Sequence, residues 1–152
     1  MPDSSVLHIS WLDPLKNSDL PLPAYHSDFA AGLDVAAAVE KEVVLEPGEI
    51  KVIPSGFSVA IAEGYEIQIR PRSGLAVKNG VTVVNSPGTV DADYRGEVKI
   101  GLINLGRSSF VIRRGDRIAQ MVMAPVARAV LEVVDQLPET RRQDGGFGHT
   151  GI

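Results

Sequence analysis

Short runs of alternating apolar and polar residues follow one another along this chain, and turn-forming residues separate them. The clearest run is Tyr65–Arg70, in which Glu66, Gln68 and Arg70 alternate with less polar neighbours. Successive side chains of a β-strand point to opposite faces, so this run predicts a strand with one polar and one apolar face. Comparable short runs occupy residues 6–12, 31–37, 41–45, 49–53, 57–61, 81–84, 89–90, 97–105, 110–112, 117–123 and 129–134.

Glycine and proline interrupt the pattern often. The chain has 15 glycines and 10 prolines among its 152 residues, too many interruptions for long helices. Residues 73–80 form the one candidate helix, a short turn with Ser73 as its N-cap and Gly80 at its end. Many short strands with turn signals between them predict an all-β fold, a jelly-roll-like barrel or sandwich with at most one short helix.

Composition narrows the class of protein. The absence of cysteine excludes disulfides, thiolate nucleophiles and cysteine-based zinc sites. No apolar run is long enough to span a membrane, and residues 1–5 show no basic region leading into an apolar stretch. We therefore expect a cytoplasmic protein that has no membrane contact. A net charge of −4 argues against nucleic-acid binding, which usually requires a basic surface.

The composition changes at Leu137, after which glycine and polar residues replace the apolar runs. We expect a β domain over residues 1–136 and a flexible glycine-rich C-terminal arm over residues 137–152. Phe147 stands among glycines in this arm and has no obvious core to join. A mobile aromatic beside an arginine suits a lid over a bound substrate, although plain terminal disorder describes most such tails.

Arginines gather at a few places along the chain, which suits a compact anion such as a nucleoside phosphate better than a long polymer. Arg70 and Arg72 precede Ser73 at the start of the candidate helix, a favourable place for a phosphate group. The alternative is a salt-bridged strand end followed by a capping serine. Gln120 is similarly ambiguous, because it either donates to a phosphate oxygen or lies on the polar face of a strand.

Residues 83–96 hold the most suggestive pattern. Two β-branched runs flank the turn-forming Asn85-Ser86-Pro87-Gly88, which predicts a hairpin. After the returning strand, Asp91 and Asp93 are expected to point to the same face. Free backbone groups at a hairpin tip can pair with a flat heterocycle, and a neighbouring carboxylate can deprotonate a water. A turn with solvated acids explains the same residues.

Five segments of the chain, in order, resemble the five motifs of the trimeric dUTPases, the deoxyuridine triphosphate nucleotidohydrolases. The segments are Ala31-Gly32-Leu33-Asp34, Arg72-Ser73-Gly74-Leu75-Ala76, residues 85–96, residues 115–120 and residues 142–148. The resemblance extends from Ala31 to Gly151. It implies an enzyme that hydrolyses dUTP to dUMP and pyrophosphate, which limits uracil incorporation into DNA and supplies dUMP for dTMP synthesis.

The resemblance also implies a role for each matching residue. Asp91 corresponds to the general base, which activates the water that attacks the α-phosphorus. Tyr94 corresponds to the residue packed under the deoxyribose, where a 2′-hydroxyl would clash. The other implied substrate-binding residues are Asn85, Gly88, Thr89 and Val90 for uracil, Arg72, Ser73, Gly74 and Gln120 for the phosphates, and Arg142, Phe147 and Gly148 in the arm.

The implied cofactor is Mg²⁺, held mainly by the phosphates of the substrate, with Asp34 reaching the ion indirectly through water. Magnesium commonly keeps several waters and binds one or two carboxylates together with substrate phosphates. The implied assembly is a homotrimer whose active sites are shared between subunits.

Two features of the arm depart from the family pattern. Gln143 stands where the family often has glycine, and Asp144 adds a negative charge beside it. Arg141 precedes Arg142, and the spacing to Phe147 selects Arg142 as the residue that contacts the γ-phosphate.

Two related alternatives are a dCTP deaminase-like enzyme and a non-catalytic nucleotide-binding relative. Deaminase chemistry needs a glutamate ten residues beyond the position of Asp91, where this chain has Gly101. A regulatory relative is expected to have lost Asp91 or the arm, and both are present. A purely structural jelly roll does not explain functional residue types at all five motifs, so we favour the hydrolase.

Overall fold

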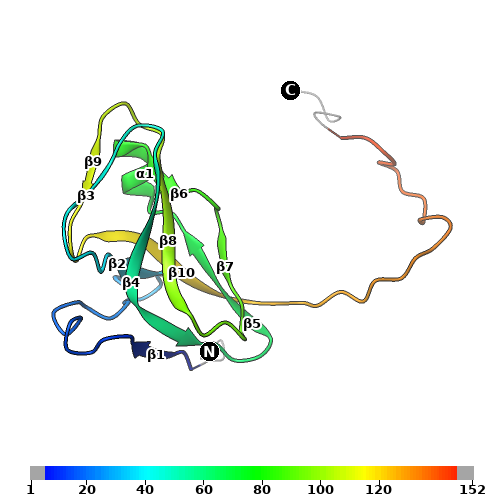
Figure 1. Cartoon of the computed structure of the whole chain (residues 1–152). Coiled ribbons are helices and arrows are strands. Elements are labelled where there is room, and N and C mark those ends of the chain that lie inside the picture. Colours follow the sequence, from blue (N-terminus) through cyan, green and yellow to red (C-terminus); the bar gives the residue numbers. More distant parts are fainter. Residues whose placement is uncertain (1–5, 147–152) are drawn as a thin grey trace.

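Two four-stranded antiparallel sheets enclose the hydrophobic core (Figure 1). This computed structural model describes residues 6–146 of the chain. The first sheet has the order β1 (His8–Trp11), β4 (Ile50–Ala60), β8 (Glu97–Asn104) and β6 (Val81–Val83). The second has the order β2 (Leu33–Ala36), β10 (Arg117–Pro125), β5 (Tyr65–Arg70) and β7 (Gly88–Val90). The pair β3 (Val43–Leu45) and β9 (Phe110–Ile112) and the helix α1 (Ser73–Asn79) complete the elements.

The predicted all-β fold with one short helix is confirmed. Alternation within the central strands fills the core. The side chains that point inward are Val98, Ile100 and Leu102 in β8 and Ile67 and Ile69 in β5. The opposite face of β5 is polar, as predicted, because Gln68 donates to Glu66 and Arg70 donates to Gln68. Burying each aliphatic side chain stabilises the fold by about 1.5–3 kcal/mol, which decides the inward face of each strand.

The two strands expected over residues 49–53 and 57–61 are one strand, β4. The turn-like sequence between them is accommodated as an irregularity, because the register against β8 shifts between Pro54 and Ser58. Gly56 has a φ of +78°, a conformation that glycine adopts without steric cost. Its N–H donates to Glu97 Oε1 at 3.0 Å. The residues that indicated a strand end therefore form a β-bulge within one continuous strand.

The helix differs from the prediction at its start and agrees with it at its end. Arg72, not Ser73, is the N-cap residue, and no side chain caps the helix. Ser73 is the first helical residue, so its hydroxyl is not used in capping. Gly80 ends the helix with a φ of 71°, and its N–H donates to Ala76 O at 3.0 Å. No helix among residues 6–146 is long and apolar enough to cross a membrane.

The predicted hairpin of residues 81–90 is wrong as a strand pair. Strand β6 pairs with β8 in the first sheet, and β7 pairs with β5 in the second. Residues 84–87 therefore cross from one sheet to the other, and the Ser86–Pro87 peptide bond within them is cis. Each short strand pairs with the edge of a longer strand, and the buried Val81 and Val83 of β6 and Val90 of β7 cover the core from that side.

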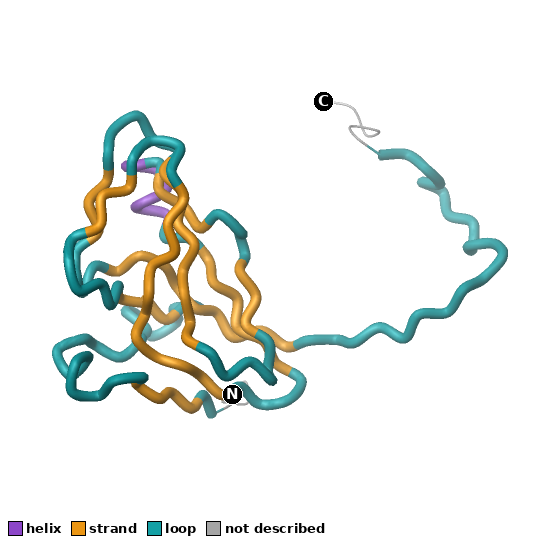
Figure 2. The backbone as a smooth tube through the Cα atoms, viewed as in Figure 1, coloured by secondary structure: helices purple, strands orange, loops and turns teal. Residues whose placement is uncertain are grey.

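The chain leaves the barrel after β10, which ends at Pro125, ahead of the domain boundary predicted at residue 136. Val126 N–H still donates to Gly64 O at 2.8 Å, and the chain beyond Arg128 extends away from both sheets (Figures 1 and 2). The strand predicted over residues 129–134 is wrong for the single chain, since Val130 is 94% and Val133 100% exposed. A strand needs a neighbouring edge for its backbone groups, and this segment has none beside it.

Candidate active site

Side chains from β2, β10 and the β5–α1 connection meet at Asp34. The Asp34 Oδ2 atom lies 3.2 Å from Arg117 Nη1 and 3.4 Å from Arg72 Nη2. His26 Nε2 lies 3.7 Å from the same oxygen. The Asp34 side chain is only 15% exposed, so these ion pairs are partly shielded from water.

Gln120 belongs to the same group, because it is the strand partner of Asp34 in β2 and of Arg70 in β5. Its Nε2 atom donates to Pro71 O at 3.0 Å, and Arg72 Nη1 donates to Arg117 O at 2.8 Å. We call Asp34, Arg72, Arg117 and Gln120 the Asp34 cluster. Two guanidinium groups face one carboxylate, and the excess positive charge suits an anion.

The absence of a side chain at Gly32 leaves room for the side chain of Gln120. A Cβ atom at Gly32 would lie 2.3 Å from Gln120 Oε1, so a larger residue would displace the amide. Ser73 and Gly74 follow Arg72 directly and are exposed in the first turn of α1. The structure thus brings together Asp34, Arg72 and Gln120 from three motifs and leaves Ser73 and Gly74 open beside them.

Asp91 lies at a second place, directly after β7. A hollow of about 170 Å³ is lined by Thr89, Val90, Asp91, Tyr94, Glu97, Val98 and Lys99, and we call it the Asp91 hollow. The loop that holds it is tied by local bonds: Tyr94 N–H donates to Asp91 O at 3.1 Å, and Tyr94 Oη donates to Glu97 O at 3.0 Å. Asp91 itself is exposed, so its carboxylate is open to a water or a ligand.

Asn85 and Gly88 lie together at the other end of β7. A Cβ atom at Gly88 would lie 3.2 Å from Asn85 Nδ2, so the amide packs against the glycine. Gly101 of β8 faces the same segment, because a Cβ atom there would lie 3.1 Å from Val84 Cγ1 and 3.7 Å from Asn85 Oδ1. The position where a deaminase needs its glutamate is thus next to Asn85 and bears no side chain.

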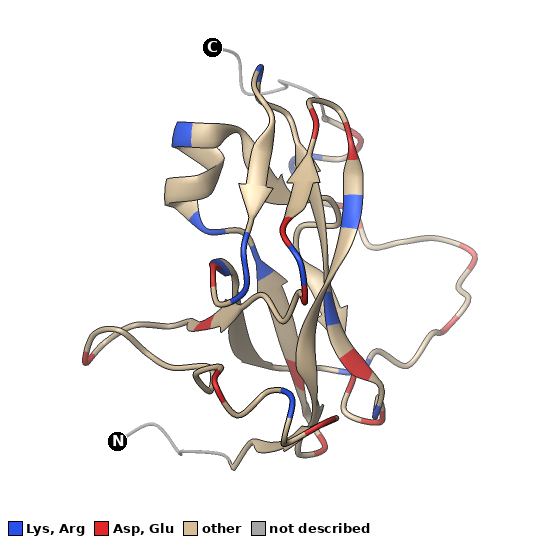
Figure 3. Ribbon diagram, turned by 60° about the vertical axis from the view of Figure 1, so that its left-hand side comes forward, with Lys and Arg blue, Asp and Glu red and all other residues tan. Residues whose placement is uncertain are grey.

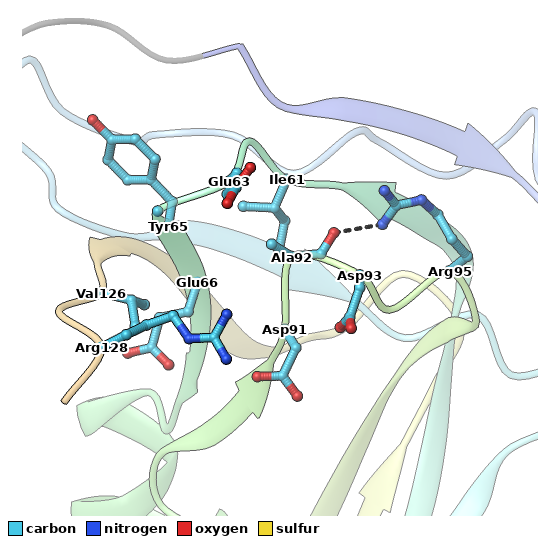
Figure 4. A pocket seen from close by; sticks show the side chains of 11 residues that line it. Ile61, Glu63, Tyr65, Glu66, Asp91, Ala92, Asp93, Arg95, Val126 and Arg128 are labelled. Atoms are coloured by element: carbon cyan, nitrogen blue, oxygen red, sulfur yellow. Dashed lines mark hydrogen bonds between the residues drawn. The ribbon is translucent and has the colours of Figure 1, made fainter. Parts of the chain in front are cut away.

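Asp91 also borders a larger hollow of about 740 Å³ (Figure 4). It lies between the β4–β5 turn, the loop after β7 and the residues that follow β10, and Asp93 lines it too. Figure 4 shows Arg128, in the segment that follows β10, extending toward Asp91 beside Glu66. Acidic and basic residues are interspersed over the barrel as a whole (Figure 3).

The two places lie apart within one chain. Among residues 6–146 no hydrogen bond or ion pair joins the Asp34 cluster to the Asp91 hollow. The order β2-β10-β5-β7 puts Asp34 and Thr89 on opposite edges of the second sheet. Arg142 lies far along the arm, where its Nε donates to Gly145 O at 2.7 Å. The predicted residues Phe147 and Gly148 lie outside the described residues.

The residues between 6 and 146 contain no group of three His, Asp or Glu side chains that could hold a metal ion. Asp34 directs one oxygen at two guanidinium groups, a cationic setting that does not suit a bare ion. The residues that the structure describes therefore provide no protein cage for a divalent cation.

Reasoning from the sequence missed Arg117, Arg128 and Lys99 as residues bordering these places. Arg117 and Gln120 are three positions apart, which in a regular strand puts them on opposite faces. The register of β10 against β2 shifts between Arg117 and Ala119, and this bulge brings both side chains to Asp34. A bulge of this kind has no clear sequence signal here.

Comparisons with known proteins agree with the geometry. Residues 18–151 match the sequence model of the dUTPase family. A deoxyuridine 5′-triphosphate nucleotidohydrolase of Desulfotalea psychrophila is 59% identical over 142 residues, which cover 93% of this chain and 95% of that protein. One of Thermoanaerobacter sp. is 53% identical over 149 residues, which cover 98% of this chain and 99% of the relative.

Solved structures give the same result. The dUTPase of Staphylococcus bacteriophage 80alpha with dUpNHpp superposes with a TM-score of 0.86 and 26% identity, covering 98% of this chain and all of the other. A mutant dUTPase from phage phi11 of S. aureus, described with a structural Mg(II) ion, has a TM-score of 0.75 and 25% identity over 86% of this chain and 97% of the phage protein.

Proposed function

This chain belongs to the dUTPase family and is a dUTP diphosphatase, and we propose that it cleaves dUTP to dUMP and pyrophosphate through a water that Asp91 activates for attack on the α-phosphorus. The observation that carries this mechanism is the position of Asp91. Its exposed carboxylate lies just after β7, in one hollow with Tyr94 and Thr89. Because the carboxylate is exposed, Asp91 can accept a proton from a water within hydrogen-bond reach.

The nucleoside would occupy the Asp91 hollow and the segment before it. Asn85 and the backbone of residues 88–90 would pair with the polar edge of uracil, and Tyr94 would lie under the deoxyribose. Buried hydrogen bonds of this kind discriminate by up to about 10⁴–10⁵ when the wrong base leaves polar groups unpaired. Support comes from the packing of Asn85 against Gly88, which leaves little room beside the amide.

The triphosphate would contact the Asp34 cluster. Arg72 and Gln120 would donate to phosphate oxygens, together with Ser73 and the backbone of Gly74. Asp34 would hold the arginine in place and reach Mg²⁺ through water. Magnesium bound with the substrate would neutralise charge on the phosphate oxygens, which is the main requirement of phosphoryl chemistry.

The spacing of these groups supports active sites shared between subunits. Gln120 pairs with Arg70, and Asp91 comes one residue after Val90, which pairs with Ile67. Strands rise about 3.4 Å per residue and lie about 4.8 Å apart, so Gln120 and Asp91 of one chain are roughly 17 Å apart. A single triphosphate does not span this distance between its α- and γ-phosphates. We therefore propose that the Asp91 hollow of one subunit works with the Asp34 cluster of another, in the homotrimer that the family resemblance implies.

The arm suits the same assembly. Residues 130–146, with exposed apolar side chains at Val130, Leu131 and Val133, extend away from the barrel of their own chain (Figure 1), so they are available to a neighbouring subunit. Arg142 would contact the γ-phosphate, and Phe147 with Gly148 would close over uracil. We accordingly propose the same division as the sequence suggested: a β domain over residues 1–136 and an arm over residues 137–152 that closes over an active site.

The rival enzyme is disfavoured by Gly101. This position faces Val84 and Asn85, where a side chain would meet the base, and a glycine cannot shuttle a proton. Hydrolysis of dUTP would limit uracil in DNA and supply dUMP for dTMP synthesis, in the cytoplasm.

The test of the proposed function is pyrophosphate release from dUTP, with dCTP, dTTP and UTP in parallel and EDTA as the control. We expect rapid, magnesium-dependent release from dUTP alone, with dUMP as the other product. Ammonia release from dCTP would revive the deaminase alternative. Tight binding of dUTP without turnover would instead identify a regulatory relative.

A further inference from the structure

The ring of Tyr94 lies directly over Gly96. A Cβ atom built on Gly96 would be 2.4 Å from Tyr94 Oη, 2.6 Å from Cζ and 3.0 Å from Cε2. Real Cβ atoms do not approach other atoms so closely, so even alanine at this position would displace the ring. The contact involves the rigid ring itself as well as the hydroxyl at its tip.

The backbone does not explain this glycine. The described glycines with positive φ are Gly48, Gly56, Gly64, Gly80 and Gly115. Gly96 is not among them, so a positive φ does not account for a glycine at this position. Position 96 therefore needs a residue without a Cβ atom, because the Tyr94 ring occupies the space where that atom would lie.

A second contact fixes the direction of the ring. Tyr94 Oη donates to Glu97 O at 3.0 Å, and the Glu97 side chain is anchored to the bulge of β4 through Gly56 N–H at 3.0 Å. The ring is thus tethered at its tip and supported from below. Tyr94 remains 44% exposed, and it lines the Asp91 hollow.

We propose that Gly96 is a positioning residue for sugar selection: because it has no Cβ, the Tyr94 ring lies low in the Asp91 hollow, at the height that admits deoxyribose and excludes a 2′-hydroxyl. This inference rests on the proposed function, in which Tyr94 contacts the sugar. It adds a determinant outside the residues that touch the substrate. Alanine at position 96 would tilt the ring and change the ratio of activities on dUTP and UTP.

The experiment compares kcat/KM for dUTP and for UTP in the wild-type protein, Gly96→Ala, Tyr94→Ala and the double variant. A misfit in a binding pocket changes discrimination by about tenfold or more, so we expect Gly96→Ala to lower the dUTP-to-UTP ratio at least that far. In the Tyr94→Ala background the same substitution should change the ratio little, because the ring it acts through is gone.

Gly106→Ala is the matched control. A Cβ atom at Gly106 would lie 2.3 Å from Asn79 O, which is as close a contact as that at Gly96 but involves the backbone of the last residue of α1. This variant should lower the melting temperature and keep the ratio. An equal change of ratio in Gly106→Ala and Gly96→Ala would assign the effect to general destabilisation and overturn the inference.

The outcomes separate this inference from the proposed function. If Tyr94→Ala relaxes the ratio and a folded Gly96→Ala does not, the Gly96 inference alone fails. If Tyr94→Ala leaves the ratio unchanged, the sugar role of Tyr94 fails and the inference fails with it. If Gly96→Ala does not fold, Tyr94→Phe decides the question, because its phenyl ring lacks the bond to Glu97 O and is positioned by the space over Gly96 alone. We expect this variant to keep most of the discrimination, and a loss as large as that in Tyr94→Ala overturns the inference.

Discussion

In the Asp34 cluster, side chains from β2, β10 and the β5–α1 connection are tied together by ion pairs and hydrogen bonds. Around the Asp91 hollow, by contrast, the hydrogen bonds of Tyr94 and Arg95 stay within residues 91–97. The first place is held by residues far apart in sequence, and its arginines are fixed before any ligand arrives. The second is a local turn with an exposed acid. The comparison separates a preorganised anion site from an open site for chemistry.

Asp91→Asn should give the largest effect, because it removes the proton acceptor from the open site. Turnover of dUTP should fall by about 10²–10⁴, while dUTP binding is kept, since the amide has nearly the same shape. Calorimetry measures the affinity for dUTP, and pyrophosphate release measures its turnover. Glu63→Gln, which changes another carboxylate lining the larger hollow, should leave turnover near normal. Near-normal kcat in Asp91→Asn would rule out the base role.

Truncation after Pro138 should be next in size. It removes Arg142 and the glycine-rich segment, so activity should fall by about tenfold or more as closure over the substrate is lost. The melting temperature should barely change, because the chain beyond Arg128 lies away from the core (Figure 2). A large drop in melting temperature would show that the arm is structural.

Asp34→Asn should break the preorganised site without touching the Asp91 hollow. Arg72 and Arg117 would lose the charge that holds them, so KM for dUTP should rise by about tenfold with a smaller change in kcat. Glu42→Gln is the matched control, because Glu42 pairs with Arg113 at 2.7 Å on an exposed surface, where ion pairs contribute little. Equal KM values in both variants would contradict the anchoring role of Asp34.

The smallest effect concerns ion pairs remote from both places. Arg114 donates to both carboxylate oxygens of Asp19 at 2.8 Å, and this hydrogen bonding lowers the pKa of Asp19 below its ordinary value of 3.8. Because the pKa of Asp19 is lower in the folded than in the unfolded protein, its ion pair stabilises the fold at pH values above the unfolded-state pKa. This contribution is lost as the pH falls through the folded-state pKa.

Asp19→Asn should therefore reduce slightly the fall in melting temperature as the pH drops below about 4, with dUTP turnover unchanged at neutral pH. Thermal scans of the two proteins across that range provide the measurement. A loss of activity in this variant would mean that charged pairs away from the Asp34 cluster also support catalysis, and the contrast drawn between the two places would weaken.

Residue patterns predicted the strands well where both partners were regular. The alternation in residues 65–70 gave the correct faces of β5, and Gly80 gave the correct end of α1. The pattern failed at β4, where a bulge at Gly56 continues the strand. It also failed at residues 129–134, which alternate but have no neighbouring strand edge to pair with. Local propensity records what a segment can form, but pairing depends on which edges are free nearby.

The motifs were found from the sequence because each needs particular residue types at fixed spacing, and that information is local. The sequence by itself determined the fold class, the family resemblance and the candidate residues, including Asp91 and Tyr94. Only the tertiary structure decided that β6 and β7 enter different sheets, that a bulge brings Arg117 beside Asp34, and that Gly96 makes room for the Tyr94 ring. These outcomes depend on contacts between segments distant in the chain, and no local pattern encodes where two such segments meet.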